Sequence, residues 1–386
     1  MSSNQRSDYT IETQIVHSGY DRKTCWVQSR GGLIPGGAAV ITTQKLRLSG
    51  SDIFSGIHDL RSDDFGRTWS EPSPQPGLTR RANDDGTEDC PCDGTPTWHA
   101  ASGKLLLTGH LARYRNDELV ADPRPRATYT SVYDDISRRW SDWQTIALPA
   151  DDPAGFNSGA GCAQRYDLPD GDILLPIYYR ALDDASHCYK VSVMRCGFDG
   201  QEVTFQTRGP DLTCSEPRGL GEPSLTRFDG RYFMTLRNDV RGYVAVSRDG
   251  LGFDPVKPWQ FDDGAEIGNY NTQQHWVTRP EGLFLVYTRR GANNDHVFRH
   301  RAPLFMAQVD PDRLCLIRAT ERRVVPERGA RLGNFGICEA SADESWVIAT
   351  EWMQTTGPDC HDSTVCERYG SDNAIFLTRI GWQKPS

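Results

Sequence analysis

Short apolar runs, separated by turn-forming residues, recur along the chain. The clearest pair runs from Glu222 to Arg237, where two β-rich segments flank Asp229-Gly230. An Asp-Gly pair between such segments is the strongest short signal of a β-hairpin. Glu222 begins the first strand and Arg237 ends the second, so a carboxylate and a guanidinium lie at the same end. If other hairpins repeat this layout, that end is a candidate active site.

Further segments repeat the pattern at intervals of roughly 50 to 70 residues, which suits one four-stranded propeller blade each. Their turns lie near Gly103, Gly171, Gly282 and Glu344, and a sixth unit starts near residues 32–44. The pattern predicts an all-β fold, a six-bladed β-propeller, with seven blades as the alternative. The second strands of five hairpins end on titratable or aromatic residues, namely His110, Tyr178, Arg237, Arg289 and Glu351.

One domain is the simplest account of the organisation of the chain. Its 386 residues include 36 Gly and 23 Pro, which suits a turn-dense β protein, and no linker or charge block divides it. We expect residues 1–8 to be disordered and residues 9–386 to form a single catalytic propeller. Strands at Thr10–Ser18 and Asn373–Trp382 would pair to complete one blade.

The net charge of the chain argues against two classes of binding partner. A formal net charge of −9 argues against nonspecific binding to nucleic acid or acidic membranes. The N-terminus lacks the apolar core of a signal peptide, and no apolar run reaches transmembrane length. The sequence as written therefore indicates a cytoplasmic protein, whereas a trimmed chain would be periplasmic or secreted. The oligomeric state is not readable from the sequence.

The 11 cysteines are scattered, and we expect buried free thiols. Cys90 with Cys92, and Cys360 with Cys366, would close loop disulfides in an exported protein. No cysteine spacing fits a zinc site, so we expect no metal and no other cofactor. A Ca²⁺ ion at the site is the alternative to this expectation.

The segment SDDFGRTW, residues 62–69, matches the Asp-box pattern Ser-x-Asp-x-Gly-x-Thr-Trp. In such a turn the Asp accepts backbone N–H groups, the Gly takes a positive φ and the Trp packs beneath. Degenerate copies follow at residues 133–140 and 247–253. With these turns and the periodic hairpins, the chain resembles the sialidase superfamily, the Asp-box (BNR-repeat) propellers that act on carbohydrates. The resemblance covers nearly the whole chain.

The resemblance implies roles for several residues. Glu222 and Arg237 stand where the family has its middle-blade Glu and the second Arg of its substrate-carboxylate clamp, and Arg301 resembles the third Arg. Asp52 lies roughly where the acid/base Asp would be. Glu351 resembles the acid that orients an Arg.

Two departures from the family pattern matter. Leu33-Ile34-Pro35 stands where Arg-Ile-Pro is expected, so the first Arg is missing unless Arg30 substitutes for it. Asn334 opens the last blade, where the Tyr nucleophile would be. Without that phenol the retaining mechanism has no nucleophile, so we expect a divergent member with different chemistry.

Further residues are candidates for proton transfer. His110 and His275 are the preferred catalytic histidines, because the period places them at the mouth of the channel and imidazole titrates near neutrality. His58 and His99 are assigned to substrate binding. Each histidine also suits a purely structural hydrogen bond.

The remaining candidates would recognise the sugar. Tyr270 and Gln274 lie in the segment 266–276, whose polar side chains suit either sugar hydroxyls or the exposed backbone of an ordinary loop. Tyr178 would be a rim aromatic or a general acid. Arg289 would join Arg237 and Arg301 in binding a carboxylate, since guanidinium binds carboxylates bidentately.

Three functions remain open, all with an oligo- or polysaccharide as partner. A glycoside hydrolase would use two carboxylates from Asp52, Glu222 and Glu351 on a terminal acidic or deoxy sugar, and loss of the Tyr favours inversion. A polysaccharide lyase on a rhamnose–glucuronate or ulvan-type glycan would use Arg, His and Tyr, and a Ca²⁺ ion would favour it. A non-catalytic carbohydrate-binding propeller is the third. The retained Glu222 and Arg237 favour the hydrolase.

Overall fold

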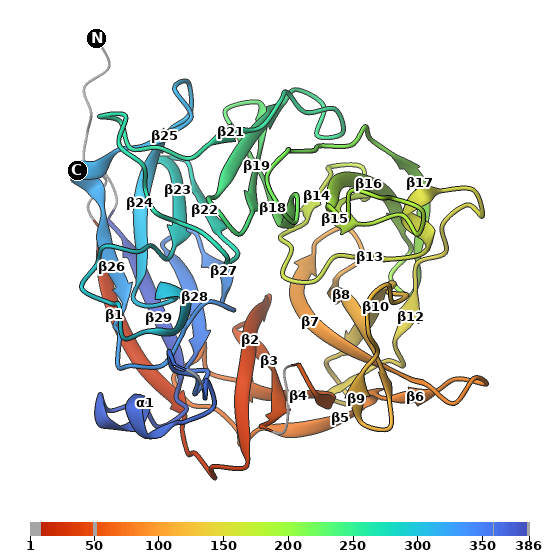
Figure 1. Cartoon of the computed structure of the whole chain (residues 1–386), viewed down its shortest axis with the longest axis horizontal. Helices are drawn as coiled ribbons and strands as arrows, with labels where there is room; N and C mark the ends of the chain where they lie inside the picture. The colour runs from red at the N-terminus through yellow and green to blue at the C-terminus, as the bar shows by residue number, and fades with distance from the viewer. Residues whose placement is uncertain (1–8, 49–51, 358, 384–386) are drawn as a thin grey trace.

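The structure is a computed structural model that describes residues 9–48, 52–357 and 359–383. Within these ranges the strands form six antiparallel sheets around a central axis (Figure 1). The predicted all-β propeller is confirmed. The expectation of disorder at residues 1–8 lies outside the described residues.

Successive parts of the chain build successive sheets. The sheet nearest the start of the chain contains β2 (Thr24–Ile34), β3 (Ala38–Arg47), β4 (Phe54–Ser62) and β5 (Ser73–Thr79). The next contains β6 (Arg81–Ala82), β7 (Glu88–His99), β8 (Lys104–Arg115), β9 (Glu118–Leu119), β10 (Thr128–Asp134), β11 (Arg139–Trp140) and β12 (Gln144–Thr145). The third contains β13 (Ser158–Gly159), β14 (Tyr166–Asp167), β15 (Ile173–Tyr179), β16 (Lys190–Phe198) and β17 (Val203–Arg208).

The second half of the chain continues this arrangement. The fourth sheet contains β18 (Gly221–Phe228), β19 (Arg231–Arg237), β20 (Tyr243–Ser247) and β21 (Lys257–Pro258). The fifth contains β22 (His275–Arg279), β23 (Gly282–Tyr287), β24 (Leu304–Asp310), β25 (Cys315–Leu316) and β26 (Arg322–Val325). The sixth contains β27 (Gly336–Ser341), β28 (Glu344–Thr350), β29 (Ile375–Trp382) and β1 (Tyr9–His17).

Strands from the two ends of the chain close the sixth sheet. β1 pairs with β29 in an antiparallel ladder that runs from Tyr9 opposite Trp382 to His17 opposite Ile375. The predicted pairing of the two terminal segments is therefore present. The hydrogen bonds of this ladder attach the start of the chain to the sheet that contains its last strands.

The core consists of apolar layers between neighbouring sheets. Leu105 and Leu107 of β8, for example, pack with Val40 and Ile57 of the preceding sheet. Because each sheet is covered on both faces, its strands read as nearly continuous apolar runs, such as the fully buried ILLPIYY of β15.

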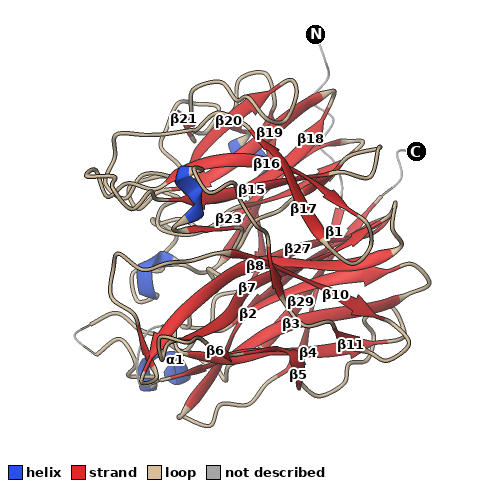
Figure 2. Ribbon diagram, turned by 90° about the vertical axis from the view of Figure 1, so that its right-hand side faces the viewer, coloured by secondary structure: helices blue, strands red, loops and turns tan. Residues whose placement is uncertain are grey.

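Helical segments are short and lie mostly on one side of the sheets (Figure 2). They are α1 (Thr364–Arg368) and the 3₁₀ turns η1 (Pro153–Gly155), η2 (Phe298–His300) and η3 (Arg318–Thr320). No helix in the described part of the chain has the length and hydrophobicity needed to cross a membrane. The cysteines are free thiols, so neither expected loop disulfide is present.

The turn at residues 62–69 has the local structure that its sequence predicts. Asp64 accepts hydrogen bonds from the N–H groups of Arg67 and Thr68, both at 2.9 Å, and from the Thr68 hydroxyl at 2.7 Å. Gly66 has a φ of +72°, and a Cβ at this position would lie 2.9 Å from the Trp346 ring. Glycine is therefore required both by the turn and by the adjacent sheet.

Asp59 of β4 connects two neighbouring sheets. Its carboxylate accepts hydrogen bonds from Gln75 Nε2 at 2.7 Å and from Trp140 Nε1, in the next sheet, at 3.0 Å. Burial raises the pKa of Asp59 to about 6, although both hydrogen bonds oppose the rise. An unfolded Asp titrates near pH ~4. The folded protein thus binds this proton more tightly, and this contribution to stability is lost as the pH rises from about 4 to about 6.

We expect Asp59→Asn to remove this pH dependence. The Asn Oδ1 can accept from Trp140, and a rotated Gln75 amide can present its unpartnered Oε1 to the new NH₂ group. Between about pH 4 and pH 7 the free energy of unfolding should shift in favour of the variant by roughly 3 kcal/mol. Urea unfolding at a series of pH values measures this, and parallel pH profiles for both proteins would contradict the assignment.

Candidate active site

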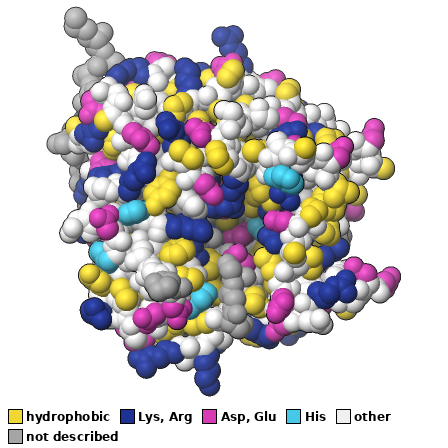
Figure 3. Space-filling model, in the orientation of Figure 1, with side chains coloured by type: hydrophobic (Ala, Val, Ile, Leu, Met, Phe, Trp, Pro, Cys, Tyr) yellow, Lys and Arg dark blue, Asp and Glu magenta, His cyan; other side chains and the backbone are white. Residues whose placement is uncertain are grey.

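A pocket of about 420 Å³ opens at one end of the central axis. In Figure 3 it is a hollow bordered by Lys and Arg side chains, with acidic side chains inside. Its titratable lining residues include Asp52, Asp93, His110, Arg124, Arg126, Tyr178, Arg218, Glu222, Arg237, Arg299, Arg301 and Arg331.

A repeated backbone feature turns side chains of the innermost strands toward this pocket. Register shifts interrupt the pairing of β2 with β3, of β7 with β8 and of β18 with β19. Within each shift stands a non-glycine residue of positive φ: Gln28 at 60°, Asp93 at 54° and Glu222 at 44°. All three line the pocket. Bulges redirect side chains in this way, and such backbone strain is typical of functional sites.

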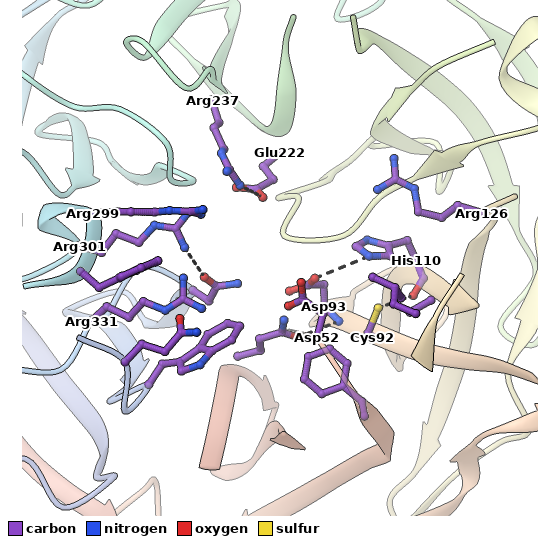
Figure 4. A pocket seen from close by; sticks show the side chains of 18 of the residues that line it. Asp52, Cys92, Asp93, His110, Arg126, Glu222, Arg237, Arg299, Arg301 and Arg331 are labelled. Atoms are coloured by element: carbon purple, nitrogen blue, oxygen red, sulfur yellow. Dashed lines mark hydrogen bonds and ion pairs between the residues drawn. The ribbon is translucent and has the colours of Figure 1, made fainter. Parts of the chain in front are cut away.

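On one wall of the pocket, a single amide oxygen accepts hydrogen bonds from three arginines. Asn271 Oδ1 accepts hydrogen bonds from Arg237 at 2.7 Å, from Arg301 at 3.1 Å and from Arg299 at 3.3 Å. Asn334 Oδ1 accepts a further bond from Arg301 at 3.3 Å. We call Arg237, Arg299, Arg301 and Arg331 the arginine wall (Figure 4).

Arg331 is the least compensated member of the arginine wall. It is 5% exposed, and its guanidinium carbon lies 3.4 Å from the centroid of the Trp352 ring. In the described chain it makes no ion pair, and its buried Nε has no hydrogen-bond partner. Burial lowers the pKa of Arg331 to about 9; Asp52 partly opposes this effect, and Arg299 reinforces it.

Arg301 is buried like Arg331, at 4% exposure, whereas the Arg299 side chain is exposed at the pocket mouth. Burial, followed by the charges of neighbouring arginines, lowers the pKa of both side chains. Their hydrogen bonds go to neutral oxygens of Asn271 and Asn334. Since a buried charge without a counter-ion is costly, Arg301 and Arg331 favour an anion in the pocket.

Two carboxylates of the described chain form ion pairs with the arginine wall, both through Arg237: Asp239 at 3.3 Å, and Glu222, which also lines the pocket. Glu222 forms a buried ion pair with Arg237, with the two side chains 15% and 9% exposed. Burial raises the pKa of Glu222, but Arg237 and Arg301 lower it, and the net pKa lies below the usual value. Glu222 is therefore ionised and holds Arg237, at the hairpin end where the sequence places both.

Asp93 lies elsewhere in the lining and has a different environment. Its Oδ1 accepts from Arg30 at 3.3 Å and from the Cys162 thiol at 3.0 Å, while its Oδ2 lies 3.7 Å from His110 Nε2. Burial raises the pKa of Asp93, with Arg30 opposing. The pocket thus contains one carboxyl group biased toward protonation and another, Glu222, biased toward ionisation.

His110 and Tyr178 meet edge to face, with ring centroids 6.2 Å apart. Burial, followed by the charge of Arg126, lowers the pKa of His110 well below its usual value. Burial also raises the pKa of Tyr178. Near neutral pH the imidazole is therefore unprotonated and the phenol protonated.

One group of residues in the described chain could hold a metal ion. Ligand atoms of Cys92, Asp93 and His110 all lie within 4.8 Å of one another. Sulfur and nitrogen donors suit zinc, whereas Ca²⁺ prefers oxygen. Burial keeps the pKa of the Cys92 thiol well above its usual value, so binding there would require loss of a tightly held proton.

The structure brings six of the candidate catalytic and substrate-binding residues into the pocket lining. They are Asp52, His110, Tyr178, Glu222, Arg237 and Arg301. Arg30 is fully buried behind the pocket on Asp93 and is not among the lining residues. Leu33-Ile34-Pro35 lies at the β2–β3 turn, and Gln28 is the β2 residue in the lining.

Two other candidates from the hairpin ends form ion pairs outside this lining. Glu351 accepts from Arg328 at 2.8 and 2.9 Å, and it also caps the backbone N–H groups of residues 372 and 374. Arg289 pairs with Glu321 at 2.7 Å. Both side chains therefore fasten loops to strand ends.

The remaining candidates also lie outside the pocket lining, each with a structural partner. His275 is 1% exposed and bonds to the Ser224 hydroxyl at 2.7 Å. Gln274 accepts from Thr235, Tyr270 bonds to His300, His58 packs against Trp26, and His99 bonds to Ser102 and to the carbonyl of Gly171.

Sequence reasoning did not single out Asp93, Arg126, Arg299 or Arg331. Arg299 stands two residues from Arg301 in the segment HVFRHR, so that segment carried a usable signal. Asp93 reaches the pocket through its bulge, which the sequence pattern does not reveal. Arg331 follows no predicted strand end.

Comparisons with known proteins identify the fold. No protein-family model matches the chain, and no curated protein matches it. Among solved structures, a Dyadobacter fermentans protein of unknown function is 14% identical with a TM-score of 0.61, covering 97% of this chain and 99% of that one.

Sialidases are also among the similar structures. A Hadza microbial sialidase has a TM-score of 0.66 at 11% identity, covering 95% of this chain and 68% of its own. Trypanosoma rangeli sialidase in complex with the inhibitor DANA has a TM-score of 0.61 at 12% identity, covering 92% of this chain. The match spans 55% of the trypanosomal chain. At such identities the likeness shows a shared sialidase-like fold.

Replacing Arg331 by Met should stabilise the folded protein. Met retains contact with Trp352 but removes a buried charge that lacks a counter-ion. We expect the free energy of unfolding to rise by about 1–3 kcal/mol, because loss of the cation–π contact offsets part of the gain. Chemical unfolding at neutral pH measures this change.

Arg290→Met is the matched control. Arg290 also lies over an aromatic ring, that of Tyr270, but it is half exposed and pairs with Glu266. Its replacement should change stability by no more than about 0.5 kcal/mol. If Arg331→Met destabilised the protein instead, the arginine wall would not be short of negative charge.

Proposed function

We propose that the protein is a carbohydrate-active enzyme that hydrolyses the glycosidic bond of an acidic sugar. The arginine wall carries this proposal, since Arg299, Arg301 and Arg331 make no ion pair with a carboxylate of the described chain. A sugar carboxylate would supply the missing anion, because guanidinium groups bind it bidentately. Each of the six sheets is then one blade, and the substrate enters at the pocket end of the axis.

The carboxyl groups that line the pocket, those of Asp52, Asp93 and Glu222, suggest the catalytic roles. Asp93, whose pKa burial raises, is suited to protonate the leaving oxygen, and Asp52 to activate water. Glu222 is already engaged by Arg237 and orients it. Tyr178 is the only tyrosine among the lining residues that the structure describes, and its raised pKa makes it a poor nucleophile. Direct attack by water, with inversion, is therefore the proposed mechanism.

We expect Asp93→Asn and Asp52→Asn to lose activity in different ways. Each should lower kcat by about 10²–10⁴-fold on a natural glycan, the usual contribution of a general acid or base. On an aryl glycoside with a good leaving group, Asp93→Asn should recover most of its activity, because the leaving oxygen no longer needs a proton. Asp52→Asn should not recover.

Asp135→Asn is the control for these variants, since Asp135 is half exposed and pairs with Arg61 at the outer edge of a sheet. Thermal unfolding of all three variants separates loss of folding from loss of chemistry. Equal recovery of Asp93→Asn and Asp52→Asn on the activated substrate would remove the proposed division of roles.

The His110–Tyr178 pair favours a second candidate, a polysaccharide lyase. A neutral imidazole can take the C5 proton of a uronate, and a protonated phenol can protonate the leaving oxygen. An arginine would neutralise the uronate carboxylate. This chemistry needs no pair of carboxyl groups at the reacting bond.

Product analysis distinguishes these functions. The protein is incubated with sialylated, rhamnosyl-glucuronate and ulvan-type glycans, and new reducing ends and the ultraviolet absorbance of an unsaturated uronate are recorded together. Reducing ends without absorbance support hydrolysis, and both signals together support the lyase. Binding without either signal would contradict both enzymes and leave a carbohydrate-binding propeller.

A further inference from the structure

Another arginine of the pocket lining, Arg126, lies on the side opposite the arginine wall, beside His110 (Figure 4). Its backbone is fixed by hydrogen bonds with Phe156 and Ser158, both at 3.0 Å. Its guanidinium carbon lies 4.2 Å from the centroid of the Tyr178 ring and 5.3 Å from that of Tyr189.

The guanidinium of Arg126 is held without a counter-ion. Within the described chain its guanidinium donates a hydrogen bond to the Tyr178 carbonyl oxygen at 3.4 Å, and its buried Nε has no hydrogen-bond partner. No carboxylate of the described chain forms an ion pair with it. Two aromatic faces and one long hydrogen bond leave most of its donors unused.

Neighbouring arginines show that this situation is specific to Arg126. Arg124 and Arg180 share the carboxylate of Asp122, at 3.8 and 3.7 Å. Arg180 also lies over the Tyr189 ring, at 5.5 Å, yet it is absent from the pocket lining. Arg124 and Arg126 both line the pocket, and of these two Arg126 is the one without a carboxylate partner in the described chain.

We propose that Arg126 is a second anion subsite, so that the substrate carries two anionic groups, one at the arginine wall and one at Arg126. This inference rests on the proposed function and narrows its substrate class. The shared chemistry is an oxyanion within hydrogen-bonding distance of Arg126. It comes either from the carboxylate of a second acidic sugar or from a sulfate ester on the same sugar.

Selenate locates anion sites without any need for catalysis. Crystals of the full chain are soaked in sodium selenate, and the anomalous signal of selenium is mapped in the pocket. We expect one site at the arginine wall and a second at Arg126, with Arg126→Gln removing only the second. A site at the wall alone would overturn the second subsite and leave the proposed function intact. A pocket without selenate would contradict both proposals.

Saccharide binding then tests whether the subsite serves a substrate. Calorimetry compares galacturonic acid, digalacturonic acid and a sulfated uronic acid on the parent protein and on three variants: Arg126→Gln, Arg126→Lys and the control Arg180→Gln. Arg126→Gln should weaken a doubly charged ligand by about 10- to 100-fold, the range expected for a hydrogen bond between charged groups. Arg126→Lys, which retains the charge, should weaken it less, and Arg180→Gln should leave it unchanged.

The two possible sources of the second anionic group, a sugar carboxylate and a sulfate ester, predict different losses of affinity in Arg126→Gln. A selective loss with digalacturonic acid assigns the subsite to a second sugar, and a selective loss with the sulfated acid assigns it to a sulfate ester. Galacturonic acid itself should bind Arg126→Gln as it binds the parent. Equal weakening of singly and doubly charged ligands, or no weakening, would overturn the second subsite.

Discussion

The pocket is built around guanidinium groups that the fold holds closer together than their charges favour. Asn271 Oδ1 is the common acceptor for Arg237, Arg299 and Arg301, and it is neutral. Glu222 and Asp239 compensate the charge of Arg237, while the Arg331 guanidinium packs on the Trp352 ring. Such a site favours an anion, because Arg301 and Arg331 are already desolvated before a ligand arrives.

The apolar layers between the sheets make this arrangement sustainable. They anchor the innermost strands firmly enough to hold strained backbone at Gln28, Asp93 and Glu222, whose positive φ values aim three side chains into one space. In a flexible surface the backbone strain would relax and the arginine side chains would move apart, which would relieve their repulsion. The stability of the sheets and the chemistry of the pocket are therefore linked, and a more stable protein is not automatically a more active one.

Much of the fold, and part of the site, follows from local sequence rules. The Asp229-Gly230 turn, the spacing of the hairpins and the pairing of the chain ends all depend on residues close to a turn or on strand composition. Glu222 and Arg237 were predictable because a hairpin fixes both at one end. Arg331 and Asp93 were not, since loop folding and a bulge place them. Glu351 and Arg289 occupy equivalent strand ends but meet Arg328 and Glu321, which are partners that the spacing of hairpins does not determine.

The β1–β29 ladder has a mechanical consequence. Tyr9 lies opposite Trp382, so the first and last residues of the ladder are neighbours at the same end. A force that pulls these two residues apart loads one backbone pair at a time, and the ladder would unzip rather than shear. Tension applied across the chain ends would thus open the sheet that closes the molecule at low force. Because Tyr9 and Trp382 are neighbours, a short linker could connect the two terminal strands. New termini could then be placed at a surface turn, which would give a circularly permuted chain.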